Sequence, residues 1–306
     1  KLLLDAGHHV VVFDNLERGH RAAVDPRADL VVGDLREPGP IREAMLAAGP
    51  DAVMHFAAYA YVGESMDDPM MYFRNNVQGG LNLVDAMLAA TVRKIIFSST
   101  CATYGQPEVV PITEETPQRP ENPYGESKLQ FEKILLWHQR RTGIEPVFLR
   151  YFNACGASGS LGEDHDPESH LIPLVLQVAL GQRDNIQVFG DDYDTPDGTC
   201  VRDYIHIEDL GRAQVLALPQ GISGPYNLGN GNGYSVKEVI ETARQVTGHP
   251  IPELMTPRRP GDPPYLIAGA DKAQRELGWT PAYPALADIL GHAWAWHQAH
   301  PDGYPD

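Results

Sequence analysis

The feature that most constrains the fold is an alternation of strand-like and helix-like stretches in the first half of the chain. The stretches that read as buried strands are His9–Phe13, Leu30–Val32, Ala52–Phe56 and Lys94–Phe97. Segments with apolar residues at helical spacing, such as Ile41–Ala48 and Met70–Ala90, lie between them. This alternation predicts an α/β fold with a doubly wound parallel sheet.

A tyrosine and a lysine four residues apart form the strongest candidate for chemistry. Pro123 suits the start of a helix, so Tyr124 and Lys128 share one face of it. A nearby ammonium favours the phenolate and lowers the tyrosine pKa from about 10, which makes a general base. Tyr-x-x-x-Lys alone is frequent and is more often a surface helix turn. Here a hydroxyl-rich strand end, Phe97–Thr100, precedes the pair, and an apolar strand, Val147–Asn153, follows it.

This order of strand, tyrosine–lysine helix and strand resembles the extended short-chain dehydrogenase/reductase superfamily, Rossmann-like in fold. Within it, the chain is most similar to UDP-glucose 4-epimerases and the related UDP-pentose 4-epimerases, over essentially its whole length. The resemblance implies an isomerase that interconverts UDP-galactose and UDP-glucose through a 4-keto sugar, with tightly bound NAD. By the same resemblance, Tyr124 removes the proton of the sugar 4-hydroxyl. Lys128 lowers the tyrosine pKa and holds the nicotinamide ribose, and Thr100 hydrogen-bonds the reacting oxygen.

The resemblance also implies two sets of binding residues. One cofactor residue, Asp14, is also indicated by its position. A carboxylate after the second strand of a dinucleotide fold typically binds the adenosine ribose hydroxyls. A role as a helix cap or turn residue is equally common for such an aspartate. The implied cofactor-binding residues are Asp14, Asn15, Asp34, Leu35, Phe56, Ala57, Asn75, Ser98, Tyr124, Lys128 and Tyr151. The implied substrate-binding residues are Thr100, Asn153, His170, Leu171, Phe189, Arg202, Tyr204, Arg259 and Asp262, with the two arginines on the diphosphate.

The start of the chain departs from the family pattern. Related proteins open with a strand and a glycine-rich turn that cradles the cofactor pyrophosphate. Lys1–Ala6 reads as the end of the helix after such a turn, and Gly229–Gly233, though glycine-rich, follows a late strand. We therefore expect an N-terminally truncated sequence lacking roughly twenty residues, including the first strand and the glycine-rich turn.

The length of 306 residues allows one large or two medium domains, and the composition argues against several classes of function. We expect an incomplete NAD-binding domain over residues 1–153 and a smaller α/β UDP-sugar domain over 154–306, some segments of which return to the first domain. The net charge of −17 argues against nucleic acid or an anionic membrane as partner. Three separated cysteines lack metal spacing, so we expect no metal site and a reduced, cytoplasmic setting. No stretch is long and apolar enough to span a membrane.

Alternative functions remain at this point. Nucleotide-sugar dehydratases of the superfamily carry Asp-Glu after the threonine, whereas this chain has Cys101-Ala102, so dehydration is disfavoured. A UDP-arabinose/UDP-xylose 4-epimerase is one alternative, and an inactive fragment or non-enzymatic dinucleotide sensor is another. The resemblance implies that Leu266 stands at the position that gates N-acetylated sugars, and its intermediate size leaves that preference open. The resemblance further implies a homodimer through the helices Met70–Ala90 and Tyr124–Arg140.

Overall fold

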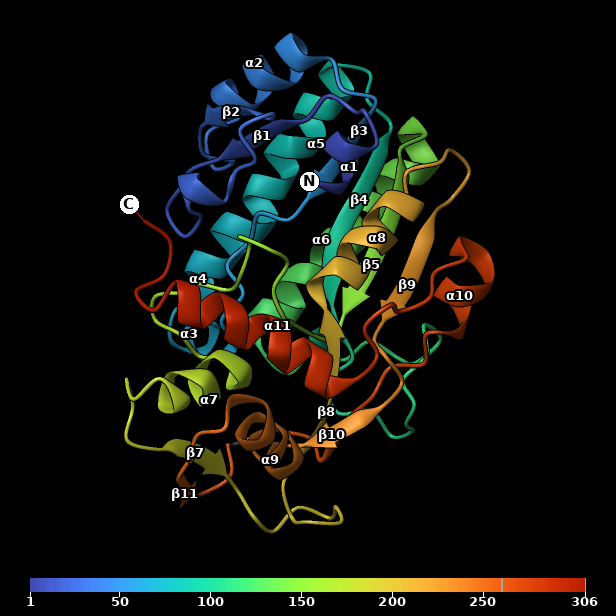
Figure 1. Ribbon diagram of the computed structural model, residues 1–306. Helices are drawn as coiled ribbons and strands as arrows, with labels where there is room; N and C mark the ends of the chain where they lie inside the picture. Colours follow the sequence, from blue (N-terminus) through green and yellow to red (C-terminus); the bar gives the residue numbers. More distant parts are fainter. Residues whose placement is uncertain (260, 306) are drawn as a thin grey trace.

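The first half of the chain alternates strands with helices, as its sequence pattern predicts (Figure 1). The structure, a computed structural model, describes residues 1–259 and 261–305. The elements of this half are α1 (Leu2–Asp5), β1 (Val11–Asp14), η1 (Arg21–Ala23), β2 (Asp29–Val32), α2 (Pro38–Ala48), β3 (Ala52–His55), α3 (Val62–Asp67), α4 (Pro69–Tyr72), η2 (Phe73–Gln78), α5 (Gly79–Ala89), β4 (Lys94–Thr100), η3 (Cys101–Thr103), α6 (Pro123–Thr142) and β5 (Glu145–Tyr151).

Two parallel sheets carry this half. Strands β3, β4 and β5 pair in parallel, and a later strand, β9 (Gly224–Leu228), adds to the free edge of β5. Strands β1 and β2 form a second parallel pair. All the predicted strands of this half are present and parallel, so the predicted α/β fold with a parallel, Rossmann-like sheet is confirmed.

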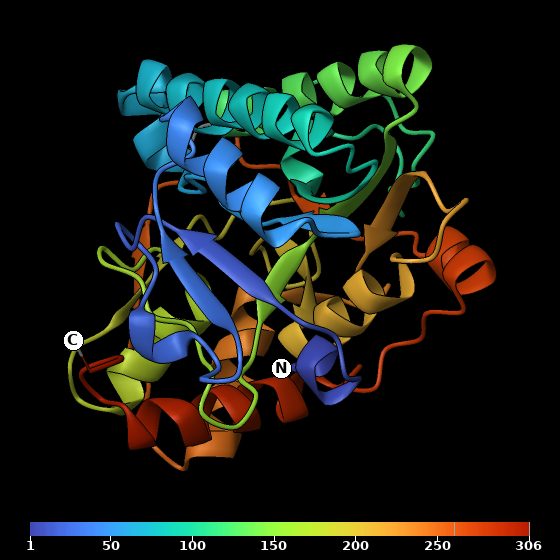
Figure 2. The same ribbon diagram turned by 90° about the horizontal axis from the view of Figure 1, so that it is seen from above.

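Successive residues of the central strands supply two different cores. Ile95 and Phe97 of β4 pack with α2, α5 and α6, whereas Ile96 packs with α8 (Ile207–Leu216) and α10 (Asp271–Leu277) on the opposite face. Side chains of a strand alternate between its faces, and both faces are covered, which explains why β4 is buried at every position. Figure 2 shows the blue-to-green helices α2, α5 and α6 on one side of the sheet and the gold and red helices α8 and α10 on the other.

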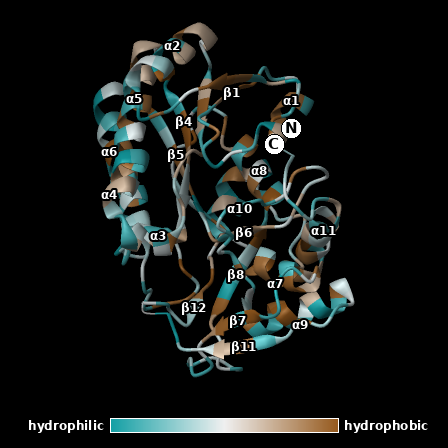
Figure 3. Ribbon diagram, turned by 90° about the vertical axis from the view of Figure 1, so that its left-hand side faces the viewer, coloured by the Kyte–Doolittle hydropathy of each residue, from teal (hydrophilic) through white to brown (hydrophobic). Residues whose placement is uncertain are grey.

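The second half contains shorter strands and a core of its own. Its remaining elements are β6 (Asn153–Cys155), α7 (Leu171–Ala179), β7 (Ile186–Phe189), β8 (Val201–His206), β10 (Gly233–Ser235), α9 (Val236–Thr247), β11 (Glu253–Thr256), β12 (Tyr265–Leu266) and α11 (Leu286–Ala299). Strand β8 pairs with β6, β10 and β12, and β7 pairs with β11. Helices α7, α9 and α11 pack against β7 and β8 to form one hydrophobic cluster (Figures 1 and 3). The domain boundary at residue 153 stays a prediction. From the second half, β9 is a strand of the first sheet, and α8 and α10 pack against that sheet.

Helix α6 begins where the sequence predicts. Asn122 accepts a hydrogen bond from the Gly125 backbone N–H at 2.8 Å, and Pro123 occupies the first turn. Gly143 ends the helix in the left-handed conformation, with φ at 73°. The predicted helix Met70–Ala90 differs, because π-helical turn η2 separates α4 from α5. No helix among the described residues is both long and apolar enough to cross a membrane.

Candidate active site

The first turns of α6 bring Tyr124 and Lys128 to the carboxyl end of β4. Lys128 is buried, and its ammonium donates to the Ser98 carbonyl at 2.9 Å. The Lys128 Nζ lies 6.0 Å from the centroid of the Tyr124 ring and 4.9 Å from that of Phe97. The predicted shared face of the helix is therefore present, and it is turned toward the end of the sheet.

Thr100 completes this cluster as the last residue of β4. Its hydroxyl oxygen accepts a hydrogen bond from the Ala102 backbone N–H at 3.1 Å. The same hydroxyl hydrogen-bonds Tyr124, which favours the phenolate. Three residues that the sequence singles out for catalysis thus meet at one point, supplied by two adjacent elements.

The pKa values of the pair differ from the sequence prediction. Burial raises the pKa of Tyr124 to about 12, and the hydrogen bond from Thr100 opposes that increase only in part. Burial lowers the pKa of Lys128 to about 7. The prediction that Lys128 lowers the Tyr124 pKa is wrong for the protein without ligand, because the ammonium turns to the Ser98 carbonyl and both groups lose their water.

The ends of β1 and β2 hold the first predicted cofactor residues side by side. Asp14 accepts a hydrogen bond from the Leu16 backbone N–H at 2.7 Å. Asn15 donates to Asp34 at 3.0 Å, and the Arg36 guanidinium holds the pKa of Asp34 down at about 2. Leu35 is half-buried. The Asp34 carboxylate therefore remains ionised at neutral pH and can accept hydroxyl donors.

The ends of β3, β4 and β5 hold the next set. Phe56, directly after β3, is 56% exposed although it is aromatic, and Ala57 beside it is also exposed. The Ser98 hydroxyl lies 3.0 Å from the hydroxyl of Tyr151, the last residue of β5. Asn75 lies in η2, half-buried. Except for Asn75, these residues lie at or near the carboxyl ends of parallel strands, where ligands of such folds bind.

The second half brings four predicted substrate residues together in two pairs. The buried Arg202 on β8 donates to the Asp262 carboxylate at 2.7 Å across 60 positions of sequence. The Arg259 guanidinium lies 3.9 Å from the centroid of the Phe189 ring. A cation over an aromatic face is oriented without being neutralised, so Arg259 keeps its charge available.

The other predicted substrate residues lie around β6 and α7. Asn153 of β6 is aligned with Tyr204 of β8 in a parallel register. The Tyr204 side chain is buried in the core of the second half, and Leu171 packs against that core at the start of α7. Leu266 is aligned with Arg202 across β12 and β8. His170 is the residue before α7, and its ring nitrogen faces Glu163 at 2.6 Å.

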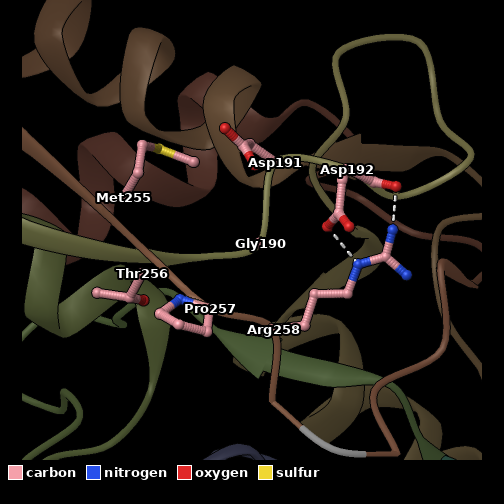
Figure 4. Close-up of a pocket in the computed structure, with 7 residues that line it drawn as sticks. All are labelled: Gly190, Asp191, Asp192, Met255, Thr256, Pro257 and Arg258. Atoms are coloured by element: carbon pink, nitrogen blue, oxygen red, sulfur yellow. Dashed lines mark hydrogen bonds and ion pairs between the residues drawn. The ribbon is translucent and has the colours of Figure 1, made fainter.

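A surface pocket adjoins the Phe189–Arg259 pair. Figure 4 shows its lining, in which the Arg258 guanidinium donates to Asp192. The lining residues are Gly190, Asp191, Asp192, Met255, Thr256, Pro257 and Arg258. None of these lining residues was predicted from sequence. Two of them are neighbours of predicted residues, because Gly190 follows Phe189 and Arg258 precedes Arg259.

Sequence reasoning missed the residues that support the site. Asn76, beside the predicted Asn75, accepts from the Tyr59 N–H at 2.9 Å and donates to Ser127 of α6 at 3.0 Å. Glu132 and Arg150 form a buried ion pair at 2.6 Å that joins α6 to β5. A charge at a core-facing helix position, next to the fully buried Phe131, was the available signal for Glu132.

Comparison with known proteins defines the class. The model of the NAD dependent epimerase/dehydratase family matches residues 1–229, and the chain belongs to this family. NAD, the predicted cofactor, is therefore confirmed.

The most similar relatives are named for one particular activity. The UDP-glucose 4-epimerase of Halalkalibacterium halodurans is 53% identical over 99% of this chain and 92% of its own length. The solved UDP-glucose 4-epimerase of Brucella ovis in complex with NAD has a TM-score of 0.93 and 47% identity, covering 96% of this chain and 92% of that one. The Bifidobacterium longum UDP-glucose 4-epimerase in complex with NAD+ and UDP has a TM-score of 0.94 and 41% identity, covering 99% and 95%. The resemblance to UDP-glucose 4-epimerases that the sequence indicates is thus confirmed.

Proposed function

We propose that this chain interconverts UDP-galactose and UDP-glucose as an NAD-dependent 4-epimerase. The observation that carries the proposal is the meeting of Tyr124, Thr100 and Lys128 at the end of β4. When bound, NAD supplies a hydride acceptor for the sugar C4 and a hydride donor for the return step. The names of the relatives described above support the choice of sugar nucleotide.

In this proposal, Tyr124 holds and returns the proton of the sugar 4-hydroxyl, and Thr100 hydrogen-bonds the same oxygen. The high Tyr124 pKa of the ligand-free protein must fall for the phenol to act as a base. A positive charge near the phenol does this, and the Lys128 Nζ, 6.0 Å from the centroid of the Tyr124 ring, is placed to supply one. Lys128 and Thr100 are buried and Tyr124 is partly buried. Removal of water from such a site strengthens the electrostatic interactions in it.

The strand ends fit the proposed dinucleotide. Asp14 and Asp34 offer carboxylate acceptors for ribose hydroxyls, and exposed Phe56 and Ala57 at the end of β3 offer an apolar surface. Gly19 faces Asp14 closely, since a Cβ there would lie 2.9 Å from the Asp14 Oδ1. The further cofactor residues proposed are Asn15, Leu35, Asn75, Ser98 and Tyr151.

The diphosphate and sugar fall to the second half in this proposal. Arg202 and Arg259 provide guanidinium groups, which match phosphate oxygens. These two positive charges offset the repulsion between an anionic substrate and a chain whose net charge is −17. Asn153, His170, Leu171, Phe189, Tyr204 and Asp262 are the other residues proposed to line this part.

A dehydratase is less well supported. Burial raises the pKa of Cys101, which stands where such enzymes have a carboxylic acid, to about 12. The thiol therefore stays protonated and cannot exchange protons near neutral pH. Epimerisation needs only the Tyr124 group for proton transfer, so it is the reaction that this residue set can complete.

The test is conversion of UDP-galactose by the NAD-loaded protein, followed by chromatography of the UDP sugars. Tyr124→Phe should lower kcat by at least roughly 100-fold, because general acid–base catalysis contributes about that much. Tyr234→Phe, at a partly buried position beside the second core, is the matched control and should keep wild-type kcat. Wild-type turnover by the Tyr124 variant would overturn the mechanism. Parallel assays with UDP-xylose and UDP-N-acetylglucosamine determine the sugar preference.

A homodimer and a cytoplasmic location complete the proposal. Four large apolar side chains are exposed on α3, α4, α5 and α6, namely Met66, Met70, Leu81 and Trp137. Apolar residues gathered on neighbouring helices are typical of an interface. The three cysteines are all free, which suits a reducing compartment.

A further inference from the structure

Four ligand-type side chains converge in the segment that leads into α7. One atom from each of Glu163, His165, Glu168 and His170 lies within 4.8 Å of the other three. The His170 Nδ1 is 2.6 Å from Glu163 and 3.3 Å from Glu168. The His165 Nδ1 is 3.4 Å and 3.7 Å from the same two carboxylates. The sequence pattern Glu-x-His-x-x-Glu-x-His thus folds into one compact group.

One ring nitrogen of this group lacks a partner. The Glu168 and Glu163 side chains are only 5% and 17% exposed, and their ion-pair partners within the described ranges are the two imidazoles. The Glu168 Oε1 also accepts the backbone N–H groups of Ser169 and His170, both at 2.7 Å. The His165 Nδ1 is shielded from solvent and has no hydrogen-bond partner of good geometry. A shielded ring nitrogen without a partner is costly unless a further group satisfies it.

We propose that Glu163, His165, Glu168 and His170 bind one divalent first-row transition-metal ion, such as Zn²⁺. Imidazole nitrogen and carboxylate oxygen lie about 2.0–2.2 Å from zinc, so the ligand atoms of a tetrahedral site are roughly 3.4 Å apart. The observed separations between nitrogen and oxygen atoms, 2.6 to 3.7 Å, bracket that value. Two imidazoles disfavour Ca²⁺ and Mg²⁺, which prefer oxygen ligands.

The charges also suit a dication. Glu163 and Glu168 offer two carboxylate ligands, and His165 and His170 offer two imidazole ligands. Two carboxylates and two neutral imidazoles together carry a charge of −2, which one divalent ion balances.

The ion would fix a segment next to the active site without taking part in the chemistry. The Tyr61 ring packs against the rings of His165 and His170, at centroid distances of 5.6 and 6.3 Å. The Tyr61 N–H donates to the Tyr72 hydroxyl, and the Tyr72 ring contacts that of Tyr124 at 6.4 Å. A structural ion there holds the start of α7 against the loop after β3.

The test measures metal binding directly and needs no turnover. The full chain is loaded with NAD, stripped with a chelator and titrated with ZnCl₂ against a chromophoric competitor, and Co²⁺ absorption then reports the ligand geometry. We expect one ion per chain. The double variant His165→Ala/His170→Ala should lose at least about tenfold in affinity, since even residues outside the ligand set cost that much. The control His8→Ala/His9→Ala removes two exposed histidines and should bind as wild type.

Glu163→Gln is the conservative companion, because it keeps the side-chain volume and removes one anionic ligand. It should weaken Zn²⁺ binding while NAD binding and circular dichroism stay unchanged. Sub-stoichiometric binding by the wild type, or equal affinity in the His165/His170 variant and its control, would refute the site. Failure of the epimerase assay with intact metal binding would refute the proposed function and leave the metal site standing.

Discussion

Lys128 is a buried ammonium whose charge destabilises the ligand-free fold, and this can be measured. Burial lowers its pKa from 10.5 to about 7, so the folded protein releases the ammonium proton before the unfolded chain does. From pH about 7 to 10.5 the unfolded chain therefore binds one more proton, and the free energy of unfolding rises with pH. Each pH unit in this window is worth about 1.4 kcal/mol.

Lys128→Met removes the titrating group and keeps most of the side-chain volume. The free energy of unfolding of the variant minus that of the wild type should fall by about 1.4 kcal/mol per pH unit, or about 2.7 kcal/mol between pH 7.5 and 9.5. The slope is the diagnostic quantity, because the lost hydrogen bond to Ser98 and any repacking add a term that does not depend on pH.

The assay is urea unfolding of both cofactor-free proteins at pH 7.5, 8.5 and 9.5, followed by fluorescence. Lys133→Met, at an exposed position of the same helix, is the control, and its difference from the wild type should be flat with pH. A flat difference for Lys128→Met as well would mean that the Lys128 ammonium keeps its proton in the fold, and the argument from burial would fail.

Three further predictions concern the scaffold, the substrate pocket and assembly. Glu132→Ala should lower the free energy of unfolding by about 3–5 kcal/mol, because it leaves Arg150 buried without its carboxylate partner. The control Glu43→Ala, at an exposed position, should be near neutral, and equal urea midpoints for the two variants would contradict the prediction. Arg202→Met should raise KM for UDP-galactose roughly 10- to 150-fold, which is the contribution of one hydrogen bond to a charged group. The control Arg275→Met, at a position 68% exposed, should leave KM unchanged. An unchanged KM for Arg202→Met would show that Arg202 does not bind the diphosphate. Trp137→Glu should weaken the dimer, as measured by sedimentation velocity. The control Val109→Glu, at an equally exposed position outside α5 and α6, should not weaken it. A monomeric wild type would refute the proposed dimer.

The sequence was most informative where the determinants are local. Pro123 and the four-residue spacing of Tyr124 and Lys128 fix a helix start and a helix face, and both depend on neighbours within one turn. The parallel sheet follows from the order of strands and helices, which needs no knowledge of distant contacts. Those predictions are confirmed for the fold, and the roles of individual site residues stay proposals.

Other features depend on residues far apart in sequence and left no local signal. The Arg202–Asp262 pair spans 60 positions. Strands β6, β10 and β12 have two or three residues each, and all three pair with β8. The π-helical turn η2 interrupts a helix whose apolar spacing reads as continuous. The pKa of Tyr124 was predicted in the wrong direction because one residue spacing reveals a neighbouring charge but not the loss of water around both groups.

The Glu132–Arg150 pair has a consequence for precision at the catalytic hydroxyl. Glu132 follows Tyr124 by eight residues, or about 12 Å along the axis of α6. Helix α6 is joined to β5 at Glu132, near its middle, and to Asn76 at Ser127, near its start, so it has little freedom to slide or rotate over the sheet. The relative position of Tyr124 and Thr100 is thereby set by two anchors outside the site. Loss of either contact would broaden the distribution of distances between the hydroxyl oxygens of Tyr124 and Thr100. Turnover rates would then vary between molecules before the fold is lost.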